Sequence, residues 1–334
     1  MAGRLACRAG RMLRRAAAAI GLVALGAGAA AAQETVRVAV LADGTVSWEV
    51  DTIQHHGLAA AHGVELEVVE LANPTATKIA LQSGRVDVAV ADWLWVSRRR
   101  QEGSELTFAP YSRAIGALMA GPDSGIDGLA DLAGRKVGIV GGPLDKNWLL
   151  LRALAMRRDL RDPGQTTETI YGAPPLMSQQ MRRGRIDAVL TYWHYAARLE
   201  ADGYRRVIDV GEIIEGLGLS GDVPMLGYVF DAGWAERNRA AVDGFLAASR
   251  EAKRILRTRD DAWTRLRPLI QPDSDAQLRA LRSGFRAGIP RTWGPAERES
   301  ARKLFDILRE LGGRELVGAS QRLAPGTFWD GLEY

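Results

Sequence analysis

Gly84-Arg-Val-Asp-Val-Ala-Val-Ala-Asp-Trp93 and Gly184-Arg-Ile-Asp-Ala-Val-Leu-Thr-Tyr-Trp193 are two versions of one stretch, 100 residues apart. Each is an apolar run that begins with a Gly-Arg pair and ends on a tryptophan. The positions that are identical at this offset are Gly84/Gly184, Arg85/Arg185, Asp87/Asp187, Trp93/Trp193, Arg98/Arg198, Gly103/Gly203 and, further upstream, Trp48/Trp148. The repeat is longer than the units of about 20–50 residues that build solenoids, so the sequence predicts two similar lobes.

Strand and helix patterns alternate on both sides of these stretches. In the first half, the strands are predicted at 36–41, 64–71 and 86–91, with helical segments at 48–62 and after Asn73-Pro74-Thr75. The pattern then restarts with a strand at 135–140, a helix at 147–158 and a strand at 186–190. After about residue 230, amphipathic helices are predicted at 235–257, 262–270, 275–287 and 295–311, the last of which ends at Gly312-Gly313. This alternation predicts an α/β fold with mainly parallel sheets covered by helices.

No low-complexity linker separates the parts of the chain, which predicts short crossovers between the lobes and a first lobe that is discontinuous in sequence. We predict a signal peptide at 1–32, the first part of lobe 1 at 33–115 and lobe 2 at 116–225. Residues 226–334 then complete lobe 1 and add the C-terminal helices. The chain would cross between the lobes near 112–119 and 223–230.

The first 32 residues carry five arginines and no acid, followed by an apolar run and the small residues Ala30-Ala31-Ala32. This pattern is typical of a cleavable signal peptide and predicts export to the periplasm, with cleavage before Gln33. Removing the leader changes the formal net charge from +4 to −1. The basic balance therefore belongs to the leader, and we expect no nucleic-acid partner.

Catalytic and metal-binding signatures are missing from the sequence. Cys7 is the only cysteine and lies in the leader, so the remaining chain has no thiol nucleophile and no disulfide. The histidines are His55, His56, His62 and His194, without the partners and spacing of a metal site. No P-loop or G-x-S-x-G motif occurs. We therefore expect no enzyme activity, no metal and no cofactor.

Three segments resemble the nitrate/sulfonate/taurine-type solute-binding proteins, a group that includes the pyrimidine-precursor (THI5-like) binders. They are IALQSGRVDVAVAD at 79–92, DLAGRKVGIVGG at 131–142 and MRRGRIDAVLTYW at 181–193. The resemblance implies a type II periplasmic binding protein fold with a ligand cleft between two lobes. It also implies a small-molecule ligand, delivered to an ABC permease and its ATPase. We expect a monomer, since no heptad seam or long apolar run follows residue 32.

Aromatic residues gather where the predicted strands end, which is where open α/β sheets bind ligands. Rings stack on planar groups or accept a cation, carboxylates accept hydrogen bonds from amines, and capped helix starts offer free N–H groups. The candidate ligand-binding residues are Asp43, Trp48, Asn73, Thr75, Asp92, Trp93, Trp148, Tyr192, Trp193 and His194. Lys146 and Arg113 could complement a ligand carboxylate, but solvated surface charges are the commoner outcome and are expected here. Asp87 and Asp187 are expected to stabilise the lobes.

The sequence departs from the family pattern at Asp92-Trp93-Leu94-Trp95, where sulfonate-type members usually carry small residues. A carboxylate in the cleft would repel an anion by about 4 kcal/mol at 4 Å and an effective dielectric of about 20. We therefore expect a planar or cationic organic solute. The alternatives are a sulfonate or nitrate anion, an exported pyrimidine-related enzyme on the same fold, and a ligand-sensing domain. No helix-turn-helix supports the sensor.

Overall fold

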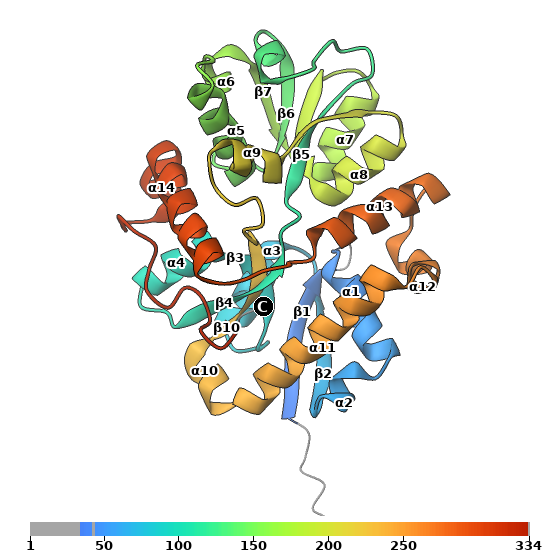
Figure 1. Ribbon diagram of the computed structural model, residues 1–334, viewed down its shortest axis with the longest axis vertical. Coiled ribbons are helices and arrows are strands. Elements are labelled where there is room, and N and C mark those ends of the chain that lie inside the picture. The colour runs from blue at the N-terminus through green and yellow to red at the C-terminus, as the bar shows by residue number, and fades with distance from the viewer. Residues whose placement is uncertain (1–33, 42–43, 333–334) are drawn as a thin grey trace, which may run out of the picture. The chain divides into compact units, whose positions relative to one another are not determined.

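The strands form hydrogen-bonded sheets in the computed structural model, which describes residues 34–41 and 44–332 (Figure 1). The predicted signal peptide at 1–32 lies outside the described residues. The strands are β1 (Glu34–Leu41), β2 (Val64–Leu71), β3 (Ala89–Asp92), β4 (Leu106–Ser112), β5 (Gly116–Ala120), β6 (Lys136–Val140), β7 (Glu168–Gly172), β8 (Ala188–Tyr192), β9 (Arg205–Asp209) and β10 (Leu226–Asp231).

Helices alternate with these strands through the first two thirds of the chain and then follow one another. The helices are α1 (Val46–His55), α2 (Leu58–Ala61), α3 (Pro74–Gln82), α4 (Trp93–Gln101), η1 (Leu129–Leu132, a 3-10 helix), α5 (Lys146–Arg157), α6 (Pro163–Thr166), α7 (Pro174–Arg182), α8 (Trp193–Ala201), α9 (Val210–Gly216), α10 (Ala232–Arg237), α11 (Arg239–Thr258), α12 (Asp261–Ile270), α13 (Asp275–Gly288) and α14 (Pro295–Val317). None of the described helices is long and apolar enough to cross a membrane.

The sheets divide the strands between two lobes, as the α/β prediction requires. One lobe contains the sheet β3-β10-β4 and the pair β1-β2, which a bridge between Val38 and Val88 connects to the strand leading into β3. The other contains the sheet β7-β6-β8-β5-β9. The pairs β1–β2, β6–β7 and β6–β8 are parallel, as expected for βα units. In contrast, β5 and β10 pair antiparallel with their neighbours, and each begins just after the chain crosses from one lobe to the other.

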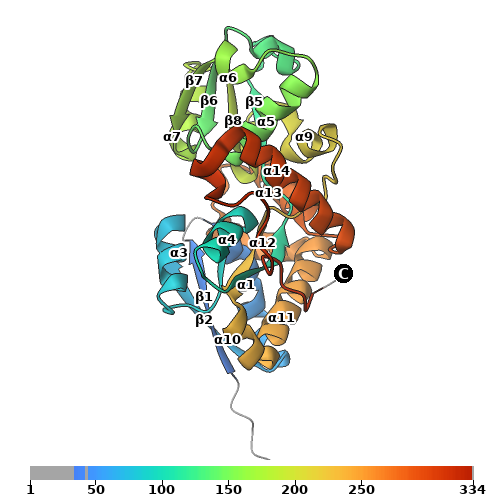
Figure 2. The same cartoon turned by 90° about the vertical axis from the view of Figure 1, so that its left-hand side faces the viewer.

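The C-terminal helices contact both lobes. Helix α13 packs on α8, which follows a strand of the five-stranded sheet. Helix α14 packs on α5 of that lobe and on α4 of the other (Figure 2). The lobes are therefore connected by helix packing as well as by the chain crossovers.

The internal repeat is present in the backbone. Helices α3 and α7 begin at Pro74 and Pro174, and helices α4 and α8 begin at Trp93 and Trp193. Gly84 and Gly184 have φ of +71° and +63°, a left-handed conformation that glycine adopts at little cost. Gly103 and Gly203 both have φ of +90°. The glycines that are identical 100 residues apart therefore lie in the turns that end equivalent helices.

Asp87 and Asp187 have equivalent structural roles. The Asp87 carboxylate accepts a hydrogen bond from the backbone N–H of Arg37 at 2.9 Å, and Asp187 accepts one from the N–H of Lys136 at 2.8 Å. Arg37 lies within β1, and Lys136 is the first residue of β6. Each aspartate thus joins the turn after a helix to a neighbouring strand, in agreement with the architectural role expected from the repeat.

One helical prediction needs correction, and one helix end agrees with its prediction. The segment 48–62 is divided into α1 and α2, because Gly57 adopts φ of +63° and interrupts the helix. The predicted stop at Gly312-Gly313 is confirmed: Gly313 has a non-helical φ of +56°, which separates the long first part of α14 from a short second helix that ends at Val317.

Replacing Asp87 by alanine should lower the free energy of unfolding by about 1–3 kcal/mol, because the Arg37 N–H and guanidinium lose their acceptor. Urea denaturation of Asp87→Ala measures this. The exposed Asp123 serves as the control, and Asp123→Ala should change stability by less than about 0.5 kcal/mol. Equal losses in the two variants would contradict the structural role of Asp87.

Candidate functional site

Two helices from different lobes begin next to each other, each capped by an aspartate. Asp92 ends β3 and caps α4, with its carboxylate accepting from the Trp95 N–H at 2.9 Å. Asp145 caps α5 by accepting from the backbone N–H groups of Asn147 and Trp148 at 3.0 and 3.3 Å. Lys146 follows directly, and its ammonium lies 3.4 Å from the Asp92 carboxylate. An ion pair therefore connects the end of a strand in one lobe to the start of a helix in the other.

The Lys146–Asp92 pair is largely shielded from water. The side chains are 29% and 12% exposed. Burial would raise the pKa of Asp92, but Lys146, Lys78 and the Trp95 N–H favour the carboxylate more strongly, so the pKa is lowered. Asp92 in turn raises the pKa of Lys146, against the effect of burial. Both groups are charged at neutral pH.

Lys78 adds a second cation. Its ammonium lies 5.0 Å from the centre of the Trp95 ring, and burial lowers its pKa. Among the described residues it has no carboxylate within 4.0 Å. Among the described residues, the Trp95 ring and, at longer range, Asp92 offset the charge of Lys78.

A cavity of about 490 Å³ opens beside the start of α5. It is lined by the loop from Gly142 to Asp145 and by Glu315 of α14. Burial raises the pKa of the Asp145 carboxyl, which favours the neutral form relative to an exposed aspartate. The volume falls within the range of about 300–1,000 Å³ typical of small-molecule sites.

The four tryptophans related by the repeat are buried in this conformation. Trp48 and Trp193 meet edge to face at 6.0 Å, and this contact connects α1 of one lobe to α8 of the other. Trp93 is fully buried against Phe328 at 6.3 Å, and Trp148 is 1% exposed within the same apolar cluster. Packing accounts for the burial of Trp93 and Trp148 as the structure stands. Their contact with a ligand stays a prediction.

The remaining candidate ligand-binding residues are Asn73, Thr75, Tyr192, His194 and Asp43. Asn73 caps α3 by accepting a hydrogen bond from the Ala76 N–H at 2.9 Å. Thr75 is the second residue of α3, and it is exposed. Tyr192, 36% exposed, has its ring 6.4 Å from that of His194. Burial, with a smaller effect of Arg198, lowers the pKa of His194 to about 4, so its ring is neutral at pH 7. Asp43 lies outside the described residues.

Two expectations about surface charge were wrong. Lys146 is paired with Asp92, and Arg113 is paired with Asp222 and donates from Nε to the Ala287 carbonyl at 2.7 Å. Lys78 and Glu315 were not among the candidates. Their positions depend on how α3 and α14 pack, and the only signal in the sequence is that Lys78 lies one helical turn after the Asn73 cap.

A family model described as NMT1/THI5-like matches residues 53–259, more than half of the chain. The chain belongs to this family. This confirms the resemblance drawn from the three sequence segments. A search of the curated proteins finds no significant match for the NMT1/THI5-like chain.

Solved structures share the fold at low sequence identity. The periplasmic aliphatic sulphonate binding protein SsuA from Escherichia coli superposes with a TM-score of 0.71 and 20% identity, covering 89% of this chain and 92% of that one. The alkanesulfonate-binding protein SsuA from Xanthomonas axonopodis pv. citri bound to MOPS superposes with a TM-score of 0.67 and 16% identity, covering 88% of this chain and 98% of that one. The desulfurization enzyme DSZB superposes with a TM-score of 0.55 and 14% identity, covering 86% of this chain and 97% of that one. The two-lobed periplasmic binding protein fold is thereby confirmed.

Replacing Lys146 by methionine should lower the free energy of unfolding at pH 7 by about 1–3 kcal/mol, since Asp92 loses its counter-charge while partly buried. The lowered Asp92 pKa means that its contribution is present above about pH 4 and is lost as the pH falls through the folded-state value. The difference between variant and wild type should therefore shrink in acid.

Urea denaturation across pH 3–8 measures this difference. Lys136→Met is the control, because the Lys136 ammonium is exposed and 3.8 Å from Glu168, and its loss should cost less than about 1 kcal/mol. A difference between Lys146→Met and wild type that does not vary with pH would contradict the Asp92 pairing.

Proposed function

We propose that this NMT1/THI5-like protein is the periplasmic solute-binding component of an ABC importer, which captures a small organic solute between its lobes and delivers it to a membrane permease and its ATPase. The observation that carries the proposal is the Lys146–Asp92 pair. It places opposite charges from two lobes at the strand ends where α/β sheets bind ligands, and Asp145, which precedes Lys146 in the chain, lines a cavity of suitable size. The fold shared with proteins named as periplasmic binding proteins supports this proposal.

The crossovers between lobes have the features of a hinge. Arg113 lies in the segment between β4 and β5, and its guanidinium pairs with Asp222 in the segment that returns before β10. The Arg113 N–H donates to the Gly288 carbonyl at 2.9 Å. A Cβ at Gly288 would lie 2.4 Å from that of Ala114, so this close approach requires glycine. Three chain segments thus meet at one place, about which the lobes would open and close.

For the solute, we propose a small organic molecule with a planar or cationic group. The Asp92 carboxylate accepts hydrogen bonds, while Trp95 and Tyr192 offer rings near it. A sulfonate-like anion is the second candidate, and Lys78 favours it, because this cation lacks a carboxylate partner within 4.0 Å among the described residues. Lys146 also offsets the repulsion that an isolated Asp92 would exert on an anion.

We propose binding without catalysis. The sequence has no cysteine after Cys7, and the described residues contain no group of three or more side chains suited to hold a metal ion. The desulfurization enzyme shares the fold at 14% identity, which carries no chemistry over to this chain. The protein would act as a monomer.

Removing a bound solute should open the lobes and increase the radius of gyration. The test compares small-angle scattering of the protein as purified with the same protein unfolded in guanidinium, dialysed and refolded. Returning the dialysed small-molecule fraction should restore the smaller radius, because the solute contacts both lobes. Identical radii in all three samples would contradict closure around a solute.

A further inference from the structure

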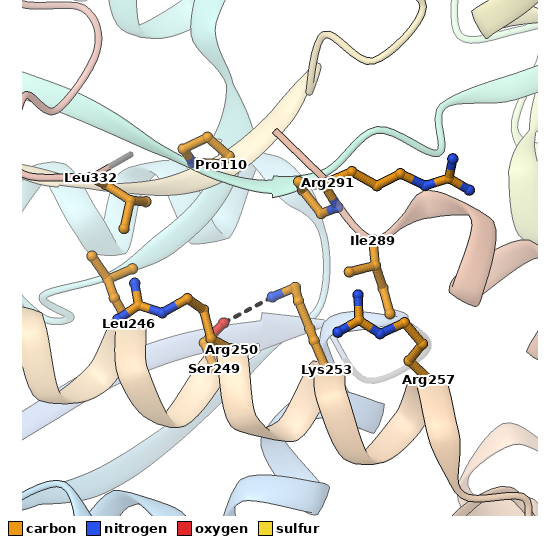
Figure 3. Close-up of a pocket in the computed structure, with 10 residues that line it drawn as sticks. Pro110, Leu246, Ser249, Arg250, Lys253, Arg257, Ile289, Arg291 and Leu332 are labelled. Carbon is orange, nitrogen blue, oxygen red and sulfur yellow. Dashed lines mark hydrogen bonds between the residues drawn. The ribbon is translucent and has the colours of Figure 1, made fainter. Parts of the chain in front are cut away.

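A second cavity lies within the lobe that contains β4 and α11, away from the Lys146–Asp92 pair. Its volume is about 220 Å³. Its apolar walls come from Pro110, Leu246, Ile289, Pro290 and Leu332. The remaining lining residues are Ser249 and four cations, Arg250, Lys253, Arg257 and Arg291 (Figure 3).

Three of these cations share one face of α11. Arg250, Lys253 and Arg257 follow one another at spacings of three and four residues, which places their side chains on the same side of a helix. Figure 3 shows Arg250 and Arg257 rising from α11 on either side of Lys253, while the Arg291 guanidinium points away from them. Like charges at such spacings destabilise a helix by about 0.2–0.5 kcal/mol per pair.

Elsewhere on α11 the cations have acidic partners. Arg239 pairs with Asp243 at 3.1 Å, and Arg254 pairs with Glu251 at 3.3 Å. No such ion pair is found for Arg250 or Arg257 among residues 34–41 and 44–332. The helix therefore concentrates uncompensated charge on the face that lines the cavity.

The floor of the cavity is a rigid polar network. The Lys253 ammonium lies 2.6 Å from the Glu49 carboxylate and donates to Ser249 Oγ at 2.8 Å. Ser249 donates to Glu49 at 2.6 Å, and all three side chains are almost fully buried. Because Glu49 balances Lys253, the positive charge available to a ligand is that of the arginines.

We propose that this cavity binds a small oxyanion with at least two negative charges, a phosphate group being the chemistry that fits best, between Arg250 and Arg257. Arginine forks recognise phosphate oxygens through paired N–H donors. The volume is below the range of about 300–1,000 Å³ typical of larger organic ligands, so the site suits a compact group. The proposal is independent of solute capture between the lobes.

Isothermal titration of the purified protein with sodium phosphate, against chloride at equal ionic strength, tests the site. We expect saturable binding at one site per chain. Arg250→Gln and Arg257→Gln should each weaken it about tenfold or more, because each removes a charge-assisted pair. Arg254→Gln makes the same charge change on the same helix outside the cavity and should bind phosphate as the wild type does.

Thermal melting by circular dichroism verifies that each variant is folded. The absence of phosphate binding to the wild type would overturn the proposal. So would equal weakening by Arg254→Gln, which would indicate attraction by net charge alone. Unchanged binding in Arg250→Gln and Arg257→Gln would place the phosphate elsewhere, for example at Lys78 and Lys146, and would equally overturn it.

Discussion

The ion pair between Lys146 and Asp92 is the interaction on which the proposed mechanism depends. A carboxylate that is 12% exposed is stable in a protein interior only when a cation or several donors face it, and here the cation belongs to the other lobe. When the lobes move apart, water must solvate both groups. A solute that enters the cleft can offer either group a new partner, and so can exchange one set of contacts for another. Under the proposed function, the charges of the site would therefore couple binding to lobe position.

The duplication explains why the pair lies where it does. Asp92 and Tyr192 occupy equivalent positions, each at the end of a strand and before a helix that begins with tryptophan. In the same way, Asp87 connects β1 to the turn after α3, and Asp187 connects β6 to the turn after α7. The repeated stretch thus builds the frame of each lobe, while the residues that differ between the copies supply the charges.

The sequence predicted features that depend on local structure. The offset of 100 residues identified Gly84, Gly184 and the two aspartates, because turns and strand ends need particular residues at fixed spacing. It could not predict that Lys146 pairs with Asp92, since that contact depends on the arrangement of two lobes. Nor could it separate ring stacking on a ligand from packing: Trp93 lies against Phe328, from a segment more than 200 residues later. The stop at Gly312-Gly313 was predictable because glycine adopts the left-handed φ that ends a helix, whereas the short helix that follows as far as Val317 was not predicted.

The central claim is that a solute is held between the lobes by the region around Asp92 and Lys146. Mass spectrometry of small molecules released by denaturing the purified wild-type protein and the variant Asp92→Asn with Lys146→Met tests it most directly. The account predicts one organic solute in near-equimolar amount from the wild type and much less from the variant, with both proteins folded before denaturation. The same solute in equal amounts from both, or no solute bound by the wild type even after incubation with a periplasmic extract, would contradict it.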